Sequence, residues 1–133
     1  ERLRADYDGL RLSTGPHPLS FIRPHRPDLW RAADLPAAHD GEYIRVGGQV
    51  ICRQRPGTAK GVCFISLEDE TGVTNVIVAP ALFESLRLTL VHEPFLVVDG
   101  HVQHRHRTIH VQARRIERLD CAPLATAASH DFA

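Results

Sequence analysis

Five stretches in which apolar and polar residues alternate, with one helical stretch between the third and the fourth, constrain most strongly how this chain can fold. Alternation with a period of two residues is typical of β-strands that are buried on one face only. The predicted strands are Tyr43–Arg53, Val62–Asp69, Val73–Val78, Pro94–Gln103 and Ile109–Leu119. The predicted helix follows Pro80 and covers Ala81–Leu90, with an apolar face made of Leu82, Phe83, Leu86 and Leu90.

The glycines and turn residues of these stretches indicate how the strands are joined. Gly47-Gly48 in the first strand predicts a bulge or a sharp bend, as strands of closed barrels require. Ile44, Val46, Val50 and Cys52 are expected to face the core from that strand. Glu70-Thr71-Gly72 predicts a tight turn that closes a hairpin between the second and third strands, and His104–Thr108 a polar turn between the fourth and fifth.

Three strands, a helix and two further strands is the chain order of the OB fold. We therefore predict a mainly β fold, a five-stranded OB-fold Greek-key barrel with a helix between strands 3 and 4, over residues 42–119. An SH3-like barrel and a generic sandwich are the alternatives. The position of the helix favours the OB fold over both.

The segments that flank the predicted barrel have a different composition. Residues 1–41 are rich in Pro, Arg and His, and they predict a short-helix extension that lacks its own core and packs against something else. Leu3, Tyr7 and Leu10 recur at helical spacing, Leu19–Arg23 predicts one helical turn, and a short helix from Pro27 would carry Leu29 and Trp30, the latter as a packing anchor. Residues 120–133 predict a flexible tail. The start at Glu1 and the lack of Met suggest a piece of a longer polypeptide.

The bulk properties exclude several classes of protein. Formal net charge is zero, so a nucleic-acid site would have to be a local patch rather than a property of the whole surface. Three cysteines without CxxC spacing argue against a zinc ribbon or a disulfide framework, and no stretch is long and apolar enough to span a membrane. We expect a cytoplasmic location, no membrane partner, no cofactor and no metal, although His101, His104, His106 and His110 raise the question of a metal site. No catalytic constellation, P-loop or GxGxxG motif is present, so we expect no enzyme activity from this chain alone.

OB folds bind oligonucleotides on the face of strands 2 and 3, between the loops that join strands 1 to 2 and 4 to 5. In the second strand, Phe64 and Ser66 are expected to point outward, and Phe64 would stack on an unpaired base. Asn75 of the third strand would then hydrogen-bond a base edge. The expected phosphate contacts are the cations of the two loops, namely Arg53, Arg55, Lys60, Arg105 and Arg107. The alternatives are that Phe64 packs under the N-terminal segment and that the turn arginines are merely solvated.

Several motifs resemble the C-terminal OB region of bacterial error-prone DNA polymerases, relatives of the C-family DNA polymerase III alpha subunit. The resemblance rests on residues 53–61 (RQRPGTAKG), 64–72 (FISLEDETG), 75–78 (NVIV) and 93–98 (EPFLVV). Residues 10–19 are similar to the family's link from its helix-hairpin-helix region, and Ser129–Phe132 to its chain end. One departure is the basic turn His104–Arg107, which is acidic or neutral in our picture of the family.

The resemblance implies part of a translesion polymerase that is induced by DNA damage in the SOS response and acts in DNA repair and replication. Its implied partners are single-stranded DNA, accessory mutasome proteins and the remaining domains of the parent polymerase, whose catalytic carboxylates lie in a palm domain elsewhere. The barrel also resembles the anticodon-binding domain of class II aminoacyl-tRNA synthetases, in which a Phe and a polar residue at the places of Phe64 and Asn75 read a base. Two hypotheses follow: a module that holds single-stranded template, or a module that docks mutasome proteins or neighbouring polymerase domains.

Overall fold

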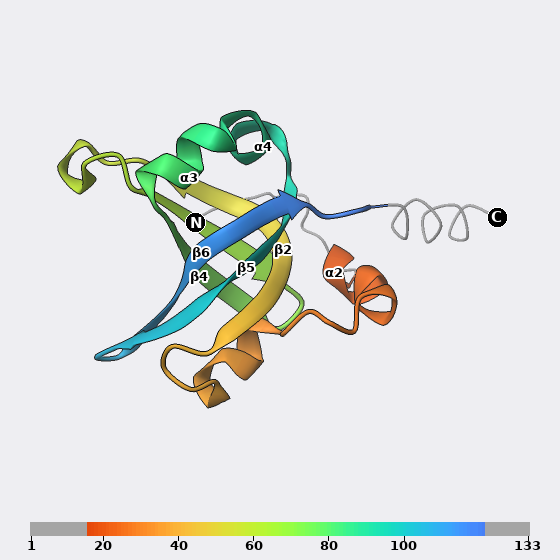
Figure 1. Cartoon of the computed structure of the whole chain (residues 1–133). Helices are drawn as coiled ribbons and strands as arrows, with labels where there is room; N and C mark the ends of the chain where they lie inside the picture. The colour runs from red at the N-terminus through yellow and green to blue at the C-terminus, as the bar shows by residue number, and fades with distance from the viewer. Residues whose placement is uncertain (1–15, 122–133) are drawn as a thin grey trace.

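The computed structural model describes residues 16–121, which form a closed barrel with a segment along its outside (Figure 1). The expectations for Leu3, Tyr7, Leu10 and for residues 122–133 lie outside the described residues. The barrel strands are β2 (Tyr43–Gln54), β3 (Cys63–Asp69), β4 (Gly72–Val78), β5 (Phe95–Arg105) and β6 (Thr108–Arg118). Residues 16–121 contain no helix of the length and apolar character that a bilayer crossing requires.

The strands close in the order β2-β3-β4-β6-β5, which confirms the predicted OB barrel. All neighbouring strands are antiparallel except β4 and β6, which run parallel with Val76 beside Val111. Each predicted strand is present within two residues of its predicted ends. The turn between β5 and β6 is tighter than predicted, because the ladder between these strands extends to Arg105 and Thr108.

Strand β2 belongs to two ladders, because its first half pairs with β5 and its second half with β3. The glycines lie where the partner changes, and a Cβ on Gly48 would come within 2.9 Å of the Glu68 carbonyl oxygen. The predicted bulge is displaced from the glycines, since the register with β3 shifts at Ile51, between Val50 and Cys52. One extra residue reverses the alternation of side chains. Cys52 is therefore exposed, contrary to the prediction that it faces the core.

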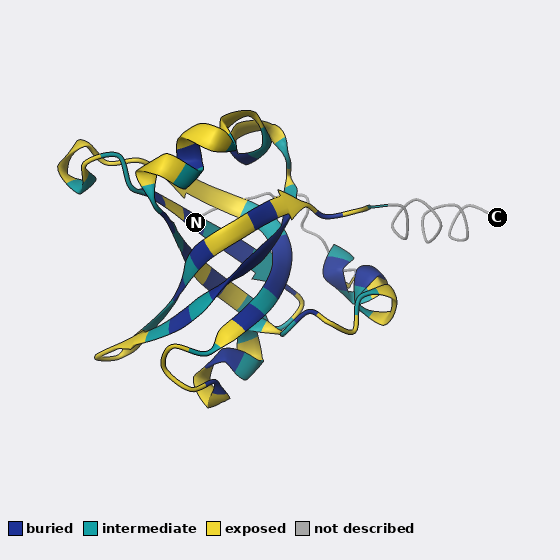
Figure 2. Cartoon of the chain, viewed as in Figure 1, coloured by how far each residue is buried: buried dark blue, intermediate teal, exposed yellow. Residues whose placement is uncertain are grey.

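The barrel interior is filled by the inward side chains of all five strands, and Figure 2 shows this buried lining. Its members are Ile44, Val46, Cys63, Ile65, Leu67, Val76, Val78, Leu96, Val98, Val102, Val111, Ala113 and Ile116, with Leu35, Ala38, Phe83 and Leu90 from outside the strands. Burial raises the pKa of the Cys63 thiol, which therefore behaves as a small apolar side chain.

The single helix predicted at Ala81–Leu90 is two short helices, α3 (Pro80–Ser85) and α4 (Arg87–His92). The break is at Leu86, whose φ of −120° and ψ of 22° leave the helical region. The hydroxyl of Ser85 donates to the Leu82 carbonyl and so competes with the helix ladder. The predicted apolar face survives the break, because Phe83 and Leu90 are buried and Leu82 and Leu86 pack against the core.

Residues 16–41 form an N-terminal strap on the outside of the barrel. It contains α2 (Pro18–Ile22) and two 3₁₀ turns, η1 (Arg23–His25) and η2 (Ala32–Ala37). Its apolar residues form a second, small core with the outward side of β5, made of Leu19, Ile22, Leu29, Val97 and Leu119. The segment was predicted to pack against another surface, and that surface is the chain's own barrel.

The helix predicted from Pro27 through Trp30 is wrong. Trp30 instead forms an isolated parallel bridge with Val46 and packs against the main core. The Trp30 N–H donates to the Arg45 carbonyl oxygen over 2.7 Å, so the strap is hydrogen-bonded to β2 at this residue. A short helix leaves most of its N–H and C=O groups without an intrahelical partner, whereas the bridge to β2 gives the Trp30 N–H an acceptor.

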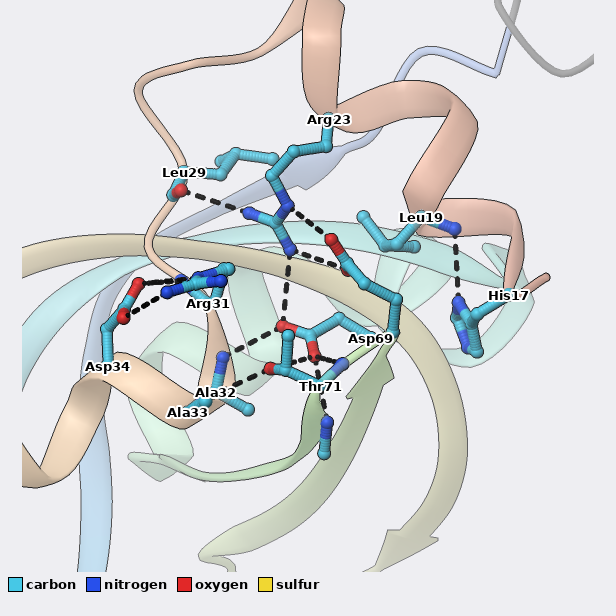
Figure 3. A network of polar contacts seen from close by, with 12 residues as sticks. His17, Leu19, Arg23, Leu29, Arg31, Ala32, Ala33, Asp34, Asp69 and Thr71 are labelled. Carbon is cyan, nitrogen blue, oxygen red and sulfur yellow. Dashed lines mark hydrogen bonds and ion pairs between the residues drawn. The ribbon is translucent and has the colours of Figure 1, made fainter.

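The buried carboxylate of Asp69 joins the strap to the β3–β4 turn (Figure 3). Its Oδ1 accepts from the backbone N–H groups of Thr71 and Gly72 and from the Thr71 hydroxyl. Its Oδ2 accepts from the Ala32 N–H at 2.9 Å and from Arg23 at 3.4 Å. Arg23 also forms a two-pronged contact with Glu70, and this hydrogen bonding lowers the pKa of Glu70.

We expect Asp69→Asn to lower the free energy of unfolding by about 2–3 kcal/mol, measured by urea denaturation. The amide has nearly the same shape, but its NH₂ group must face donors on one side of the carboxylate position. The control is Asp34→Asn, which removes an exposed carboxylate paired with Arg31 and should leave the midpoint almost unchanged. Equal effects of the two substitutions would contradict the role given to Asp69.

Candidate nucleic-acid interface

The outer face of β3 and β4 carries three of the residues predicted to bind nucleic acid. Phe64, Ser66 and Asn75 alternate with the buried Cys63, Ile65, Thr74 and Val76, as the sequence predicted. Ser66 lies directly across the ladder from Asn75. Phe64 lies opposite Ile77 on the neighbouring strand and is 37% exposed. A partly exposed aromatic ring near two side chains that can form hydrogen bonds suits an unstacked base.

The N-terminal strap leaves the Phe64 end of this face open. Its polar contacts with β3 and the following turn are at Glu68, Asp69, Glu70 and Thr71, at the other end of the strand. Its apolar residues cover the outward side of β5 instead. The alternative in which Phe64 packs under the N-terminal segment therefore has no support from residues 16–41.

Arg53 occupies a different place from the one the sequence suggested. Because the bulge at Ile51 shifts the register, Arg53 pairs with the inward-facing Ile65. Its guanidinium donates to the carbonyl oxygens of Leu90 at 2.6 Å and Glu93 at 2.9 Å, at the C-terminal end of α4. Cationic donors satisfy the unpaired carbonyls that end a helix. Arg53 thus fastens α4 to β2.

The β2–β3 loop, residues 55–62, has two exposed cations, and only one of them is paired with a carboxylate. The guanidinium of Arg55 lies 4.0 Å from the ring centroid of Phe83 and 3.4 Å from a carboxylate oxygen of Glu84, so it fixes the loop to α3. Lys60 is exposed, with a left-handed backbone at φ 55° after the 3₁₀ turn η3 (Gly57–Ala59). Of this loop's two predicted phosphate contacts, Lys60 is the one with a freely available charge among the described residues.

The β5–β6 turn and the β2–β3 loop both project on the left of Figure 1, the loop above and the turn below. Arg105 and Arg107 flank His106, whose φ of 56° makes the tight turn, and all three are exposed. The stem is held to the strap, because His104 Nε2 contacts the Ala38 carbonyl at 2.9 Å and the His104 N–H donates to Asp40. Within residues 16–121 no group of His, Cys, Asp and Glu side chains is arranged to hold a metal ion.

Unpaired positive charge is concentrated on one part of the surface. In the strap and β2, the cations Arg23, Arg26, Arg31 and Arg45 all form ion pairs with carboxylates. Within the described part of the chain, the cations whose side chains have neither an ion pair nor a hydrogen bond are Lys60, Arg105, Arg107, Arg114, Arg115 and Arg118. These residues lie on the two loops and on β6, so a chain of zero net charge has a local basic region.

Sequence reasoning missed the residues that β6 adds to this surface. In the parallel register, Asn75 lies beside His110 and Ile77 beside Gln112. The fifth strand of an OB barrel closes against the third, so the predicted fold itself contained the signal. The sequence pattern of β6 alone does not reveal that this strand lies beside β4, because α3, α4 and β5 separate β4 from β6 along the chain.

A closed barrel with this strand order and an open β3–β4 face defines the OB-fold class of oligonucleotide- and oligosaccharide-binding domains. The chain belongs to the family described as the OB-fold nucleic acid binding domain, whose model matches residues 40–119.

The relatives among curated proteins are error-prone DNA polymerases. The chain is 37% identical over 130 residues to error-prone DNA polymerase 2 of Rhizobium meliloti, which covers 96% of this chain and 12% of that protein. It is 42% identical over 137 residues to the error-prone DNA polymerase of Ralstonia nicotianae, covering 99% and 13%. With that of Alkalilimnicola ehrlichii the identity is 44% over 119 residues, covering 88% and 12%. The chain therefore spans about an eighth of the length of these relatives.

Solved structures with the same barrel come from proteins of several kinds. Asparaginyl-tRNA synthetase from Pyrococcus horikoshii, complexed with asparaginyl-adenylate, has a TM-score of 0.58 at 19% identity, covering 73% of this chain and 25% of that one. The OBody AM3L15 bound to hen egg-white lysozyme has a TM-score of 0.56 at 15% identity, covering 70% and 94%. The p204 HINb domain has 0.55 at 13%, covering 74% and 50%. At these identities the likeness concerns the fold alone.

We expect Arg53→Ala to lower the free energy of unfolding by about 1 kcal/mol, because two carbonyls at the end of α4 would be left without a charged donor. Lys60→Ala is the matched control, an exposed cation of the following loop, and should leave the urea midpoint unchanged. An unchanged midpoint for Arg53→Ala would show that this arginine does not fasten α4.

Proposed function

We propose that this chain is a single-stranded-DNA-binding module of a larger error-prone DNA polymerase, in which it holds template DNA during mutagenic synthesis past damage. The observation that carries the proposal is the open β3–β4 face, on which an exposed Phe64 lies next to the Ser66–Asn75 pair. Unpaired cations on the β2–β3 loop and the β5–β6 turn border this face. Residues 16–41 contact β5 and the end of β3 at the β3–β4 turn, and so leave the Phe64 end of this face uncovered.

Each residue has a separate role in this proposal. Phe64 stacks on one base, while Ser66 and Asn75 contribute hydrogen bonds to its edge. Lys60, Arg105 and Arg107 contact phosphates and give the affinity its dependence on salt. Arg53 and Arg55 contribute chiefly by fixing α4 and the β2–β3 loop, because their guanidinium groups already have partners within the chain.

The parent protein is inferred from the relatives. They are polymerases and the matched region is about an eighth of their length, so we assign the polymerase chemistry to other parts of such a protein. In the same proposal the parent acts in the bacterial cytoplasm after DNA damage, within an SOS-type response, together with accessory mutasome proteins. The present chain would contribute strand binding and would require neither a cofactor nor a metal.

A protein-docking role is the second candidate, and the apolar surface of α4 favours it. Leu88 is 74% exposed and Val91 is also exposed on this helix, away from the strap. Large exposed apolar side chains that lie together often mark protein contacts. An OB barrel can serve this purpose, since the OBody AM3L15 is bound to lysozyme.

Fluorescence anisotropy with a labelled oligothymidylate of about twelve nucleotides, within the range of OB site sizes, separates the two candidates. We expect Phe64→Ala to weaken binding by about 5- to 150-fold, equivalent to about 1–3 kcal/mol for one stacked base. Leu88→Ala is the matched control, because it removes an exposed apolar side chain from α4. We expect it to leave the affinity unchanged.

The salt dependence tests the phosphate contacts in the same titration. Replacing both Arg105 and Arg107 with Gln should reduce the slope of log K against log salt by about 0.7 for each phosphate that the arginines neutralise. If the native chain does not bind the oligonucleotide at about 50 mM salt, the template-holding proposal fails and protein docking becomes the better account.

A further inference from the structure

The outer face of β6 continues the candidate interface beyond β4. Neighbouring strands lie about 4.8 Å apart, so His110 is the next side chain after Asn75, and Gln112 the next after Ile77. Val76 and Val111 between them are both buried, which places these four side chains on the outside of the barrel. A single-stranded nucleic acid that crosses the β3–β4 face therefore reaches β6 next, because β6 is the neighbour of β4.

His110 carries an unsatisfied polar atom at this place. The residue is half-buried, and its Nδ1 is enclosed without a hydrogen-bond partner among the described residues. Leaving such an atom unpaired costs about 1–3 kcal/mol. A half-turn of the ring would exchange Nδ1 with Cδ2, which needs no partner, and so take Nδ1 out of the enclosed position. A ligand that offers a hydrogen-bond partner there would stabilise that orientation.

Exposed cations before β6 and within its second half give the same face a charge that complements a polyanion. Arg107 precedes the strand, and Arg114 is the extra residue of the β5–β6 bulge, between Ala113 opposite Gly100 and Arg115 opposite Asp99. This irregularity leaves Arg114 and Arg115 both exposed, in the stretch of β6 that is exposed in Figure 2. At about 3.4 Å per residue, Thr108 and Arg114 are about 20 Å apart along β6, with His110 and Gln112 between them.

The geometry points to a second nucleotide subsite on β6. In this subsite His110 and Gln112 contact the base next to the one stacked on Phe64, and Arg114 binds a phosphate of the same strand. The occupant is single-stranded DNA, because a strand offers both the base edges and the regularly spaced charges that this row of residues matches. The inference rests on the proposed function and extends its site from two strands to three.

The test uses the full chain and the same labelled oligothymidylate at about 50 and 200 mM salt. We expect His110→Ala and Arg114→Ala each to weaken binding three- to tenfold, and Arg114→Ala to reduce the salt slope by about 0.7. His92→Ala and Arg87→Ala are the controls, since both replace an exposed residue of the same type on α4. Neither should change the affinity.

A second measurement needs no substitution and is independent of folding effects. In ¹⁵N NMR spectra of the native chain, the amide signals of His110, Gln112 and Arg114 should shift when the oligothymidylate is added, together with that of Phe64. If the β6 signals and affinities stay unchanged while Phe64→Ala weakens binding, the second subsite is overturned and the proposed function stands. If the native chain binds no oligonucleotide at low salt, both are overturned.

Discussion

The buried carboxylate of Asp69 is the interaction on which the arrangement of the whole chain depends. It satisfies the donors of the β3–β4 turn with one oxygen and the backbone of the strap with the other. A buried carboxylate deprived of these donors would be strongly destabilising, so the turn and the strap must keep their relative position. From this point the strap continues along β5, where Leu19, Ile22 and Leu29 cover Val97. The outward surface of β3 and β4 near Phe64 stays open as a result.

The same arrangement explains how a chain of zero net charge can have a basic surface. Carboxylates of the strap and of the turn beside it neutralise the nearby arginines, as Glu70 does for Arg23 and Asp28 for Arg26. Hydrogen bonds from Arg26 hold the pKa of Asp28 well below its usual range, so this pairing persists in mildly acidic solution. The loops and β6 have no comparable supply of carboxylates, and their cations remain available to a ligand. The overall composition does not reveal that the paired and the unpaired cations lie on different parts of the surface.

The sequence predicted the strands, their order and the outward direction of Phe64 and Asn75, because alternation and turn chemistry are local properties. Three features were missed, and two of them depend on contacts between residues far apart in the sequence. The bulge at Ile51 arises from pairing with β3 and sends Arg53 to α4. The break at Leu86 fits two short helices over the end of the barrel. Trp30 pairs with Val46 instead of forming a helix. The residues that β6 adds to the interface follow from the predicted fold, because closure of an OB barrel places this strand beside β4.

The bulge at Ile51 decides which way the following side chains of β2 face. Removing Ile51 would close the bulge and leave Cys52 opposite Ser66 and Arg53 opposite Ile65, so Arg53 would still reach α4. If Ile51 entered the regular ladder opposite Ser66, Cys52 would lie opposite the inward-facing Ile65, and Arg53 would lie opposite Phe64 on the outer face. A one-residue change of register in β2 would thus convert an arginine that fastens a helix into one that faces a ligand. The register of this strand therefore offers evolution a direct route to exchange anchoring of α4 for added positive charge at the interface.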